Sequence, residues 1–140
     1  MRDNPVEIID LELAILIRRV TSANRKIGHL DRSAYLLLHR IIAKGPAGTK
    51  LLAEEFQLDI STVSRQTAAL EQKGYVYRIP DPLDGRAYSL QITDLGKKEF
   101  LEHQQARIEL IGKNLEAWSD EERQLFGQLL RKYNRSAVTT

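Results

Sequence analysis

The sequence predicts a mainly α-helical fold with one small β-hairpin, and three observations support this. Apolar residues recur at the 3.6-residue spacing of a helix along most of the chain. The alternation typical of a strand follows one turn-forming stretch, PDPLDGR, at residues 80–86. The 140 residues, 42% hydrophobic and 29% charged, are typical of one soluble globular domain with its own core.

Composition excludes several classes of function. The chain has no cysteine, so it holds no disulfide, no thiolate metal site, and no cysteine nucleophile or redox switch. Its first seven residues lack a basic region followed by an apolar run, and no stretch is long and apolar enough to span a bilayer. We therefore expect a cytoplasmic protein.

The first predicted helix, Val6 to Val20, carries apolar residues on two opposite faces. A surface helix needs only one such face, so the second indicates burial against a partner subunit. One face holds Val6, Ile9, Leu13, Leu16, Ile17 and Val20, and the other holds Ile8, Leu11 and Ile15. The densest basic cluster follows; it can attract phosphate or simply be a solvated helix end, and it contains Arg18, Arg19, Arg25, Lys26 and Arg32.

The next segments predict a helix-turn-helix. A second helix is expected from about Asp31 to Ala43, where KGPAG breaks the pattern, with Tyr35, Leu36, Leu38, Ile41 and Ile42 as its apolar set. Thr49 is the expected N-cap of a short third helix, Lys50 to about Gln57, buried through Leu51, Leu52 and Phe56. A turn at Leu58 and Asp59 then leads into a fourth helix that ends at Gly74.

The fourth helix has an apolar side and a side of small polar residues. The apolar side holds Ile60, Val63, Thr67 and Leu70. The other side carries short hydroxyls, one arginine and two alanines, which permit close approach to a DNA groove, where arginine can bond guanine edges or phosphate. The candidate DNA contacts are Ser61, Thr62, Ser64, Arg65 and Gln66. A solvated polar face is the alternative, but such faces more often carry Glu and Lys.

Two strands, Tyr75–Ile79 and Ala87–Ile92, are predicted on either side of PDPLDGR, with Tyr88, Leu90 and Ile92 pointing inward. A helix-turn-helix followed by a hairpin is the winged-helix arrangement, so this loop is the expected wing tip. Arg86 on a projecting hairpin can enter a minor groove, where the negative potential is deep. We expect Asp84 to hold the Arg86 guanidinium in a bidentate pair, the alternative being an exposed pair worth little energy.

The end of the chain predicts two more helices. Thr93 is the expected cap of a long helix that reaches about Trp118. Ser119, with Glu122 three residues on, predicts a capping box at the start of the last helix. That helix is amphipathic through Leu125, Phe126, Leu129, Leu130 and Tyr133. Apolar helices at both chain ends could therefore pack together across a two-fold axis.

The stretch from Leu52 to Gly96 resembles the helix-turn-helix, wing and following helix of the MarR family of bacterial transcriptional regulators. The resemblance is most specific in the wing, where Asp84, Gly85 and Arg86 are followed by Ile92, Thr93 and Gly96. It implies one domain over residues 1–140, with 31–97 as the winged helix-turn-helix lobe and 1–30 and 98–140 as dimerisation helices. It further implies a homodimeric, ligand-responsive repressor on a pseudo-palindromic operator, with Arg86 in the minor groove and Asp84 supporting it.

Three departures from the family pattern affect affinity and geometry. Gly85 stands where many members add a basic residue, which lowers the salt-dependent part of affinity. Gln57 replaces a common glycine, which predicts a tighter or shifted turn. Residues 49–93 carry five Lys or Arg against six Asp or Glu, so we expect modest affinity unless the basic cluster contributes.

Many members of the family respond to a small aromatic or anionic effector. The candidate lining of such a pocket is Tyr35, His39 and Arg40, the alternative being that Tyr35 and His39 are simply core or interface residues. The chain lacks metalloprotease, phosphate-loop and nucleophile-elbow motifs, so we expect no enzyme, no catalytic residues and no cofactor. A metal-responsive regulator using His39, His103 and Glu102, and a winged helix that binds protein instead of DNA, are the alternatives.

Overall fold

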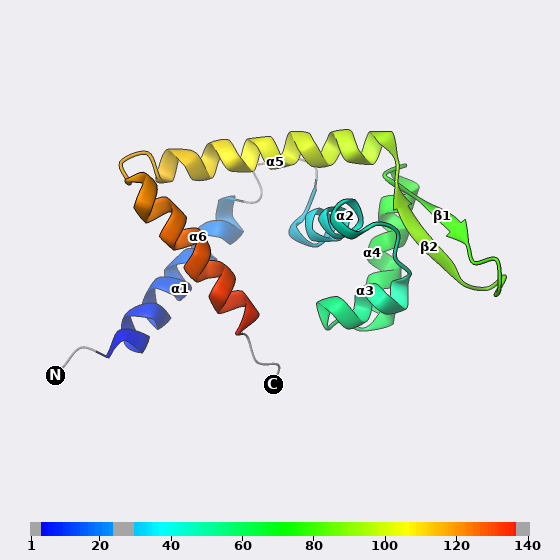
Figure 1. Ribbon diagram of the computed structural model, residues 1–140, viewed down its shortest axis with the longest axis horizontal. Helices are drawn as coiled ribbons and strands as arrows, with labels where there is room; N and C mark the ends of the chain where they lie inside the picture. Colours follow the sequence, from blue (N-terminus) through cyan, green and yellow to red (C-terminus); the bar gives the residue numbers. More distant parts are fainter. Residues whose placement is uncertain (1–3, 24–29, 137–140) are drawn as a thin grey trace. The chain divides into compact units, whose positions relative to one another are not determined.

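Six helices and one β-hairpin follow one another in the computed structural model, which describes residues 4–23 and 30–136 (Figure 1). The helices are α1 (Pro5–Ala23), α2 (Arg32–Lys44), α3 (Thr49–Phe56), α4 (Ile60–Gln72), α5 (Asp94–Asn114) and α6 (Asp120–Arg135), and the strands are β1 (Val76–Pro80) and β2 (Tyr88–Ile92). The chain forms two compact units, divided between Gln104 and Gln105 inside α5. The predicted fold class, mainly helical with a small hairpin, is confirmed.

Side-chain caps fix most of the helix starts. The Asp31 carboxylate accepts the Ala34 N–H at 2.8 Å before α2. The Thr93 hydroxyl accepts the Gly96 N–H at 2.9 Å and donates to the Gly74 carbonyl at 2.6 Å, so it starts α5 and ties it to the end of α4. These caps satisfy amide groups that have no partner inside the helix.

The predicted N-cap of α3 was wrong by one residue. Gly48, in an extended conformation, is the cap, and Thr49 is already the first helical residue. The Gly48 carbonyl accepts the Leu52 N–H at 3.0 Å, and the preceding residue, Ala47, is fixed by pairing with Leu90. Backbone pairing to the wing therefore sets the start of α3, and a threonine cap is not used.

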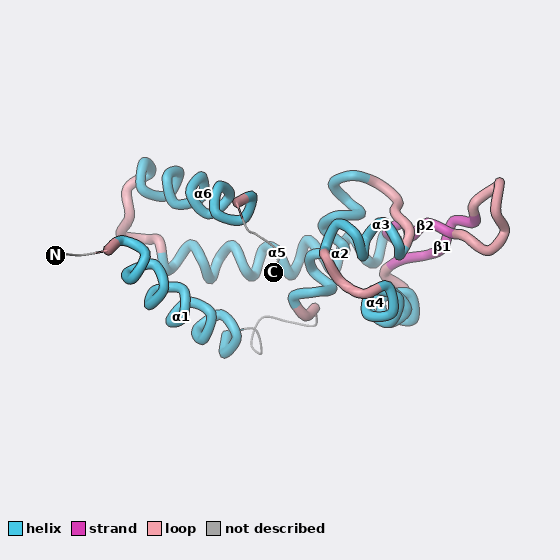
Figure 2. The backbone as a smooth tube through the Cα atoms, turned by 90° about the horizontal axis from the view of Figure 1, so that it is seen from below, coloured by secondary structure: helices cyan, strands magenta, loops and turns pink. Residues whose placement is uncertain are grey.

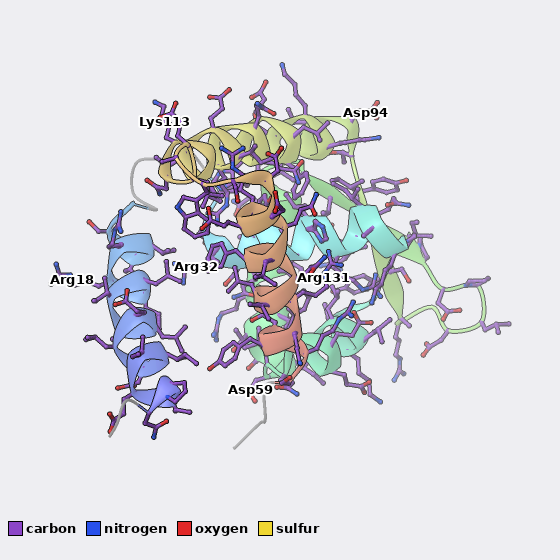
Figure 3. All side chains as sticks on the ribbon, turned by 60° about the vertical axis from the view of Figure 1, so that its left-hand side comes forward. Arg18, Arg32, Asp59, Asp94, Lys113 and Arg131 are labelled. Carbon is purple, nitrogen blue, oxygen red and sulfur yellow. The ribbon has the colours of Figure 1, made fainter. Side chains whose placement is uncertain are left out.

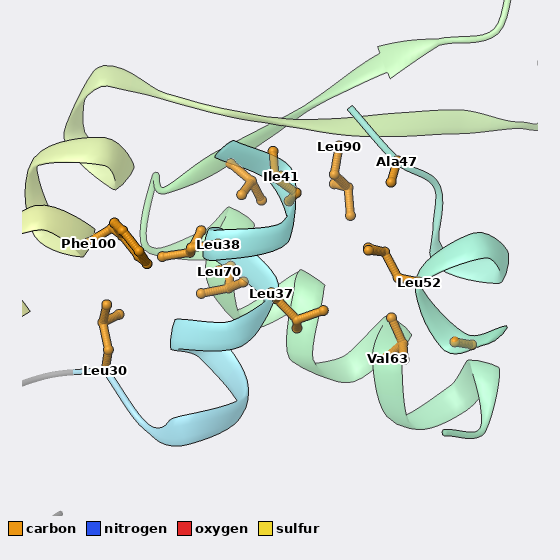
Figure 4. Packing of buried hydrophobic residues seen from close by; sticks show 12 residues of the cluster. Leu30, Leu37, Leu38, Ile41, Ala47, Leu52, Val63, Leu70, Leu90 and Phe100 are labelled. Carbon is orange, nitrogen blue, oxygen red and sulfur yellow. The ribbon is translucent and has the colours of Figure 1, made fainter. Parts of the chain in front are cut away.

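The core of the first unit lies where α2, α3, α4, β2 and the start of α5 meet (Figure 4). It contains Leu30, Leu37, Leu38, Ile41, Ala47, Leu52, Ala53, Val63, Leu70, Val76, Leu90 and Phe100, all almost fully buried. Burial of this apolar set stabilises the lobe by roughly 1.5–3 kcal/mol per large side chain. The arrangement places one face of α4 against α2 and α3 and leaves the opposite face outside.

Several predicted core positions face solvent in the single chain. Leu36 and Ile42 on α2, Leu51 on α3 and Ile60 on α4 are exposed. Helix α2 instead buries Leu37 together with Leu38 and Ile41, because the position of α4 and β2 selects that stripe of the helix. The local apolar pattern of α2 allows either stripe, so sequence spacing alone could not choose between them.

The hairpin is antiparallel and pairs Val76 with Ile92 and Pro80 with Tyr88 at its two ends. Its inner side carries Leu90, which is buried, and Tyr88 and Ile92, which pack against the core, as predicted. Ala47 exchanges two backbone hydrogen bonds with Leu90, at 3.3 and 2.8 Å, and thereby joins the loop after α2 to β2. The loop that joins β1 to β2 projects from the end of the hairpin (Figure 2).

The second unit contains the end of α5 and the helix α6. The predicted end of α5 at Trp118 was wrong, since the helix stops at Asn114. The Arg123 guanidinium of α6 donates to the Leu115 carbonyl at 3.1 and 2.9 Å and to the Glu116 carbonyl at 3.3 Å, which satisfies carbonyl groups at this turn. The Trp118 and Phe126 rings lie 5.3 Å apart across the same turn.

The capping box predicted at the start of α6 is confirmed. The Ser119 hydroxyl accepts the Glu122 N–H at 3.1 Å, and the Glu122 carboxylate accepts the Ser119 N–H at 2.9 Å. No helix in the described part of the chain combines the length and apolar character needed to cross a membrane.

Candidate nucleic-acid interface

Helix α4 is held by one face and presents the other. Val63, Thr67 and Leu70 are buried, and Thr67 also donates its hydroxyl to the Ser64 carbonyl at 3.2 Å. Of the predicted contact residues, Ser61 and Arg65 are exposed and Thr62 and Ser64 are half-buried. Ala68 and Ala69 are also exposed, and because their side chains are short, this face of α4 can approach a groove closely.

Gln66 is the least available of the predicted contacts. It is half-buried, and its Oε1 atom is enclosed without a hydrogen-bond partner among the described residues. Gln66 therefore lies at the edge of the presented face, between it and the core. Its assignment as a DNA contact stays a prediction.

The turn before α4 contains Gln57, which is the C-cap residue of α3. Gln57 adopts a left-handed conformation, φ 56° and ψ 46°. The following Leu58 N–H donates to the Ala53 carbonyl at 3.0 Å, which closes the end of α3. Glycine adopts this conformation without steric cost, whereas a residue with a side chain is strained in it. The expectation of a tighter or shifted turn stays a prediction. Asp59 then lies at the start of α4 (Figure 3).

The wing tip is shaped by its two aspartates. The Asp81 carboxylate accepts the Leu83 N–H at 2.8 Å, and the Asp84 carboxylate accepts the Arg86 N–H at 3.0 Å. The predicted bidentate pair between Asp84 and the Arg86 guanidinium was wrong, because Asp84 binds the backbone amide two residues on, as aspartates do in tight turns. Arg86 is exposed, and its guanidinium has no ion pair among the described residues.

Arg78 joins the end of α4 to the wing, and sequence reasoning missed it. Its Nε donates to a Glu71 carboxylate oxygen at 3.1 Å, and its guanidinium carbon lies 4.2 Å from the centre of the Tyr88 ring. Arg78 thus contacts α4 and both strands. Glu71 and Arg78 carry opposite charge seven residues apart, but only the fold brings a helix end beside a strand.

Arg40, a predicted effector contact, is committed to structure. Its Nε and Nη2 donate to the two Glu55 oxygens at 2.6 and 3.0 Å, and Nη1 donates to the Gly45 carbonyl at 3.2 Å. These hydrogen bonds hold the pKa of Glu55 below its ordinary value, and the same contact raises the pKa of Arg40. Arg40 therefore ties α2 to α3 and also closes the end of its own helix.

Tyr35 and His39, the other two predicted effector contacts, lie beside Phe100 at the start of α5. The Tyr35 ring stacks on Phe100 at 4.9 Å and lies 5.3 Å from His103, and the His39 ring lies 5.9 Å from Phe100. Tyr35 packs against the core, whereas His39 is exposed. The three predicted residues thus share α2 but serve different contacts, and their effector role stays a prediction.

The predicted basic cluster is only partly described. Arg18 and Arg19 are exposed on α1 and Arg32 is exposed at the start of α2, while Arg25 and Lys26 lie outside the described residues (Figure 3). In the described ranges, no three His, Cys, Asp or Glu side chains gather closely enough to hold a metal ion, so His39, His103 and Glu102 do not form the suggested site.

Comparisons with known proteins agree with this geometry. The sequence profile of the MarR family matches residues 30–88, from just before α2 to the start of β2. The HTH-type transcriptional regulator YxaD of Bacillus subtilis is 46% identical over 138 residues, which covers 96% of each chain.

Solved structures share the whole fold. The crystal structure of MarR superposes with a TM-score of 0.77 at 25% identity, over 96% of this chain and 92% of that one. The PcaV transcriptional regulator from Streptomyces coelicolor, solved in complex with its natural ligand, superposes with a TM-score of 0.73 at 20% identity, over 99% of this chain and 100% of that one.

Proposed function

The chain belongs to the MarR family of winged helix-turn-helix transcriptional regulators, and from this membership we propose that it is a ligand-responsive repressor binding a pseudo-palindromic operator as a homodimer. It is a DNA-binding regulator of transcription by family. The proposal adds four points to this: that the protein is a homodimer, that it represses transcription, that it responds to an effector, and that it is cytoplasmic, where it would meet its operator.

One observation carries the proposed DNA contact. Arg65 on the presented face of α4 and Arg86 on the wing tip are both exposed. They belong to one lobe, because Arg78 and the packing of Val76 connect the wing to α4. In this proposal Ser61, Thr62, Ser64 and Arg65 face the major groove, and Arg86 enters the adjacent minor groove. Asp84 supports Arg86 by shaping its backbone.

Exposed apolar side chains support the homodimer. On α1 these are Val6, Ile8, Ile9, Leu11, Ile15, Leu16 and Ile17, and on α6 they are Leu125, Phe126, Leu129, Leu130 and Tyr133, each more than a third exposed in the single chain. Monomeric soluble proteins rarely expose apolar rows of this length. A second copy would cover both helices and place two winged lobes on two half-sites.

The effector proposal rests on Tyr35 and His39 and on the solved PcaV complex, whose natural ligand shows that a protein of this fold can hold one. An aromatic acid would place its ring against Tyr35 and Phe100. Its carboxylate would have to compete with Glu55 for Arg40, because Glu55 already occupies that guanidinium. An effector that binds the conformation without DNA more tightly than the DNA-bound conformation lowers the affinity for DNA. The size of the decrease is set by the difference between its affinities for the two conformations.

The proposed function is tested by selecting duplexes from a random pool with the full-length protein and measuring their binding by fluorescence anisotropy. Arg65→Ala and Arg86→Ala should each weaken binding, with Arg65→Ala also relaxing sequence preference, since a bidentate base contact is worth roughly 1–3 kcal/mol. Arg131→Ala on α6 is the matched control. Binding unchanged in both test variants would contradict the proposed docking.

Regulation is tested with the same duplex. Salicylate or a related aromatic acid should release the protein reversibly. Hydrogen peroxide should not release it through thiol chemistry, because the chain has no cysteine. A reporter gene placed behind the selected operator should be transcribed more strongly when the gene for this protein is deleted. Weaker transcription would identify an activator.

A further inference from the structure

Leu83 at the wing tip is 96% exposed, well beyond the 66% of the next most exposed large apolar residue among those described. Exposed single leucines are common on protein surfaces. This one differs in its place, because it lies in the loop that joins the two strands of the hairpin (Figure 2). Its own N–H donates to the Asp81 carboxylate at 2.8 Å, and the next residue, Asp84, accepts the Arg86 N–H at 3.0 Å. The loop thus displays a leucine in a defined conformation.

The rest of the loop has little else to offer a partner. Asp81 and Asp84 both turn a carboxylate oxygen onto loop amides, and Pro82 and Gly85 carry no functional group. Among residues 81–86, Leu83 and Arg86 are therefore the two long side chains left to reach outward. A loop that presents an arginine and an aliphatic side chain three residues apart matches the minor groove, where phosphates line the rims and the sugar edges form apolar walls.

We propose that Leu83 is a second DNA-contact residue of the wing, packing its side chain against the sugar walls of the minor groove that Arg86 enters. This inference rests on the proposed function. Other minor-groove-binding proteins insert aliphatic side chains into the groove, where these make apolar contacts. The contact of Leu83 is therefore non-ionic, unlike that of Arg86, and the two contributions respond differently to salt.

Affinity measurements over a series of salt concentrations separate the two residues. On a duplex selected by the parent protein, Leu83→Ala and Leu83→Asn should each raise the Kd about ten-fold or more, as expected for losing a few buried carbon groups. The slope of log Kd against log salt should not change. Leu83→Met, which stays aliphatic, should remain within about two-fold of the parent. Arg86→Ala should instead reduce the salt slope by about one for each wing that engages the duplex.

These variants should fold normally, because Leu83 contacts almost nothing in the free chain. Thermal unfolding of each checks this directly. The inference would be overturned if Leu83→Ala and Leu83→Asn both had a Kd within two-fold of the parent while Arg86→Ala bound more weakly. That result would leave the proposed function standing. Failure of the parent to bind any duplex from the pool would overturn both.

Position is tested independently of affinity. Because the chain has no cysteine, Leu83→Cys creates a single attachment site for an iron–EDTA reagent that cleaves nearby deoxyribose. Cleavage should appear on both strands at the outer edges of the operator, with the offset typical of the minor groove. The cysteine-free parent treated in the same way is the control. Cleavage absent from the duplex, or centred in a major groove, would contradict the placement of Leu83.

Discussion

Arg40 of α2 and Glu55 of α3 form a two-bond ion pair, with Nε 2.6 Å from Oε1 and Nη2 3.0 Å from Oε2. The Arg40 side chain is 11% exposed and that of Glu55 is 32% exposed. A planar guanidinium facing a carboxylate in this way fixes orientation as well as distance. The pair sets how α3, the first helix of the helix-turn-helix, lies against α2.

Arg40→Ala should lower the thermal stability of the protein at neutral pH, because it removes both bonds to Glu55 and the bond to the Gly45 carbonyl. Glu55→Gln should act in the same direction but less strongly. Glu54→Gln, on the exposed neighbouring carboxylate, is the matched control and should leave the melting temperature unchanged. Equal melting temperatures for Arg40→Ala and the parent would contradict a structural role for the pair.

The same pair predicts a pH dependence. The folded pKa of Glu55 is lowered from its ordinary value of 4.5, chiefly by the Arg40 hydrogen bonds. Stability from this pair is therefore fully present above pH 4.5 and is lost as the pH falls through the lowered pKa. The difference in unfolding free energy between parent and Glu55→Gln should shrink as urea titrations move from pH 7 into that acidic range. A difference that stays constant would show that Glu55 is not the group responsible.

Gly96→Ala should destabilise the protein by ~3 kcal/mol, since an added Cβ would meet the Tyr75 carbonyl oxygen at 2.1 Å and only backbone movement can relieve that overlap. Gly112→Ala, in the same helix with open space around it, should instead stabilise by about 0.5–1 kcal/mol through helix propensity. Urea unfolding of the two variants measures both. Similar effects of the two substitutions would contradict the close contact of α5 with Tyr75.

Gln57→Gly should stabilise the fold by up to about 1 kcal/mol, because glycine adopts the left-handed conformation without steric cost. Gln57→Val should destabilise it, since a β-branched residue fits that conformation poorly. The expected order of melting temperatures is Gly, then Gln, then Val. A lower melting temperature for Gln57→Gly would show that the glutamine side chain stabilises the turn more than its conformation strains it.

Gly85→Arg should strengthen DNA binding at low salt. Gly85 has an ordinary φ and no atom within 4 Å of an added Cβ, so the wing accepts a side chain there. One more phosphate contact steepens the salt dependence of log Kd by about 0.9 for each wing that engages the duplex. Gly85→Ala is the control and should bind as the parent does. An unchanged slope for Gly85→Arg would mean that the loop tip stands away from the phosphates.

Leu129→Asp, on the apolar face of α6, should convert the proposed dimer into monomers at micromolar concentration, because it places a charge in the apolar interface. Sedimentation equilibrium measures the change in mass. Gln128→Asp, at an exposed neighbouring position of α6, should leave the mass unchanged. A parent protein that already sediments as a folded monomer would overturn the dimer proposal.

The parts of the fold that were predictable are those governed by neighbours in sequence. Thr93, Ser119 and Glu122 cap amides within three residues of themselves, so local chemistry settles their role. The end of α5 was not predictable in this way, because Arg123 reaches back across the turn to bind Leu115. Residues 115–118 contain no glycine or proline that would announce the break.

The candidate site shows the same division. The exposed face of α4 follows from helical spacing around Val63, Thr67 and Leu70. The partner of each charged residue does not, because a carboxylate can choose among arginines and amides that only the folded chain brings close. Glu55 accepts hydrogen bonds from Arg40, fifteen positions away in the sequence, whereas Asp84 accepts one from the Arg86 amide two residues on and does not bind the Arg86 guanidinium.

The paired backbone of Ala47 and Leu90 separates the hairpin into an anchored base and a free outer loop. Substitutions at the base disturb the core, because Leu90 is 1% exposed and its bonds also set the start of α3. The outer loop does not pack into the core, and surface loops of this kind accept insertions and changes of length. Changes in the outer loop can therefore alter the reach and charge of the wing, and under the proposed function its operator preference, without disturbing the helices packed against its base.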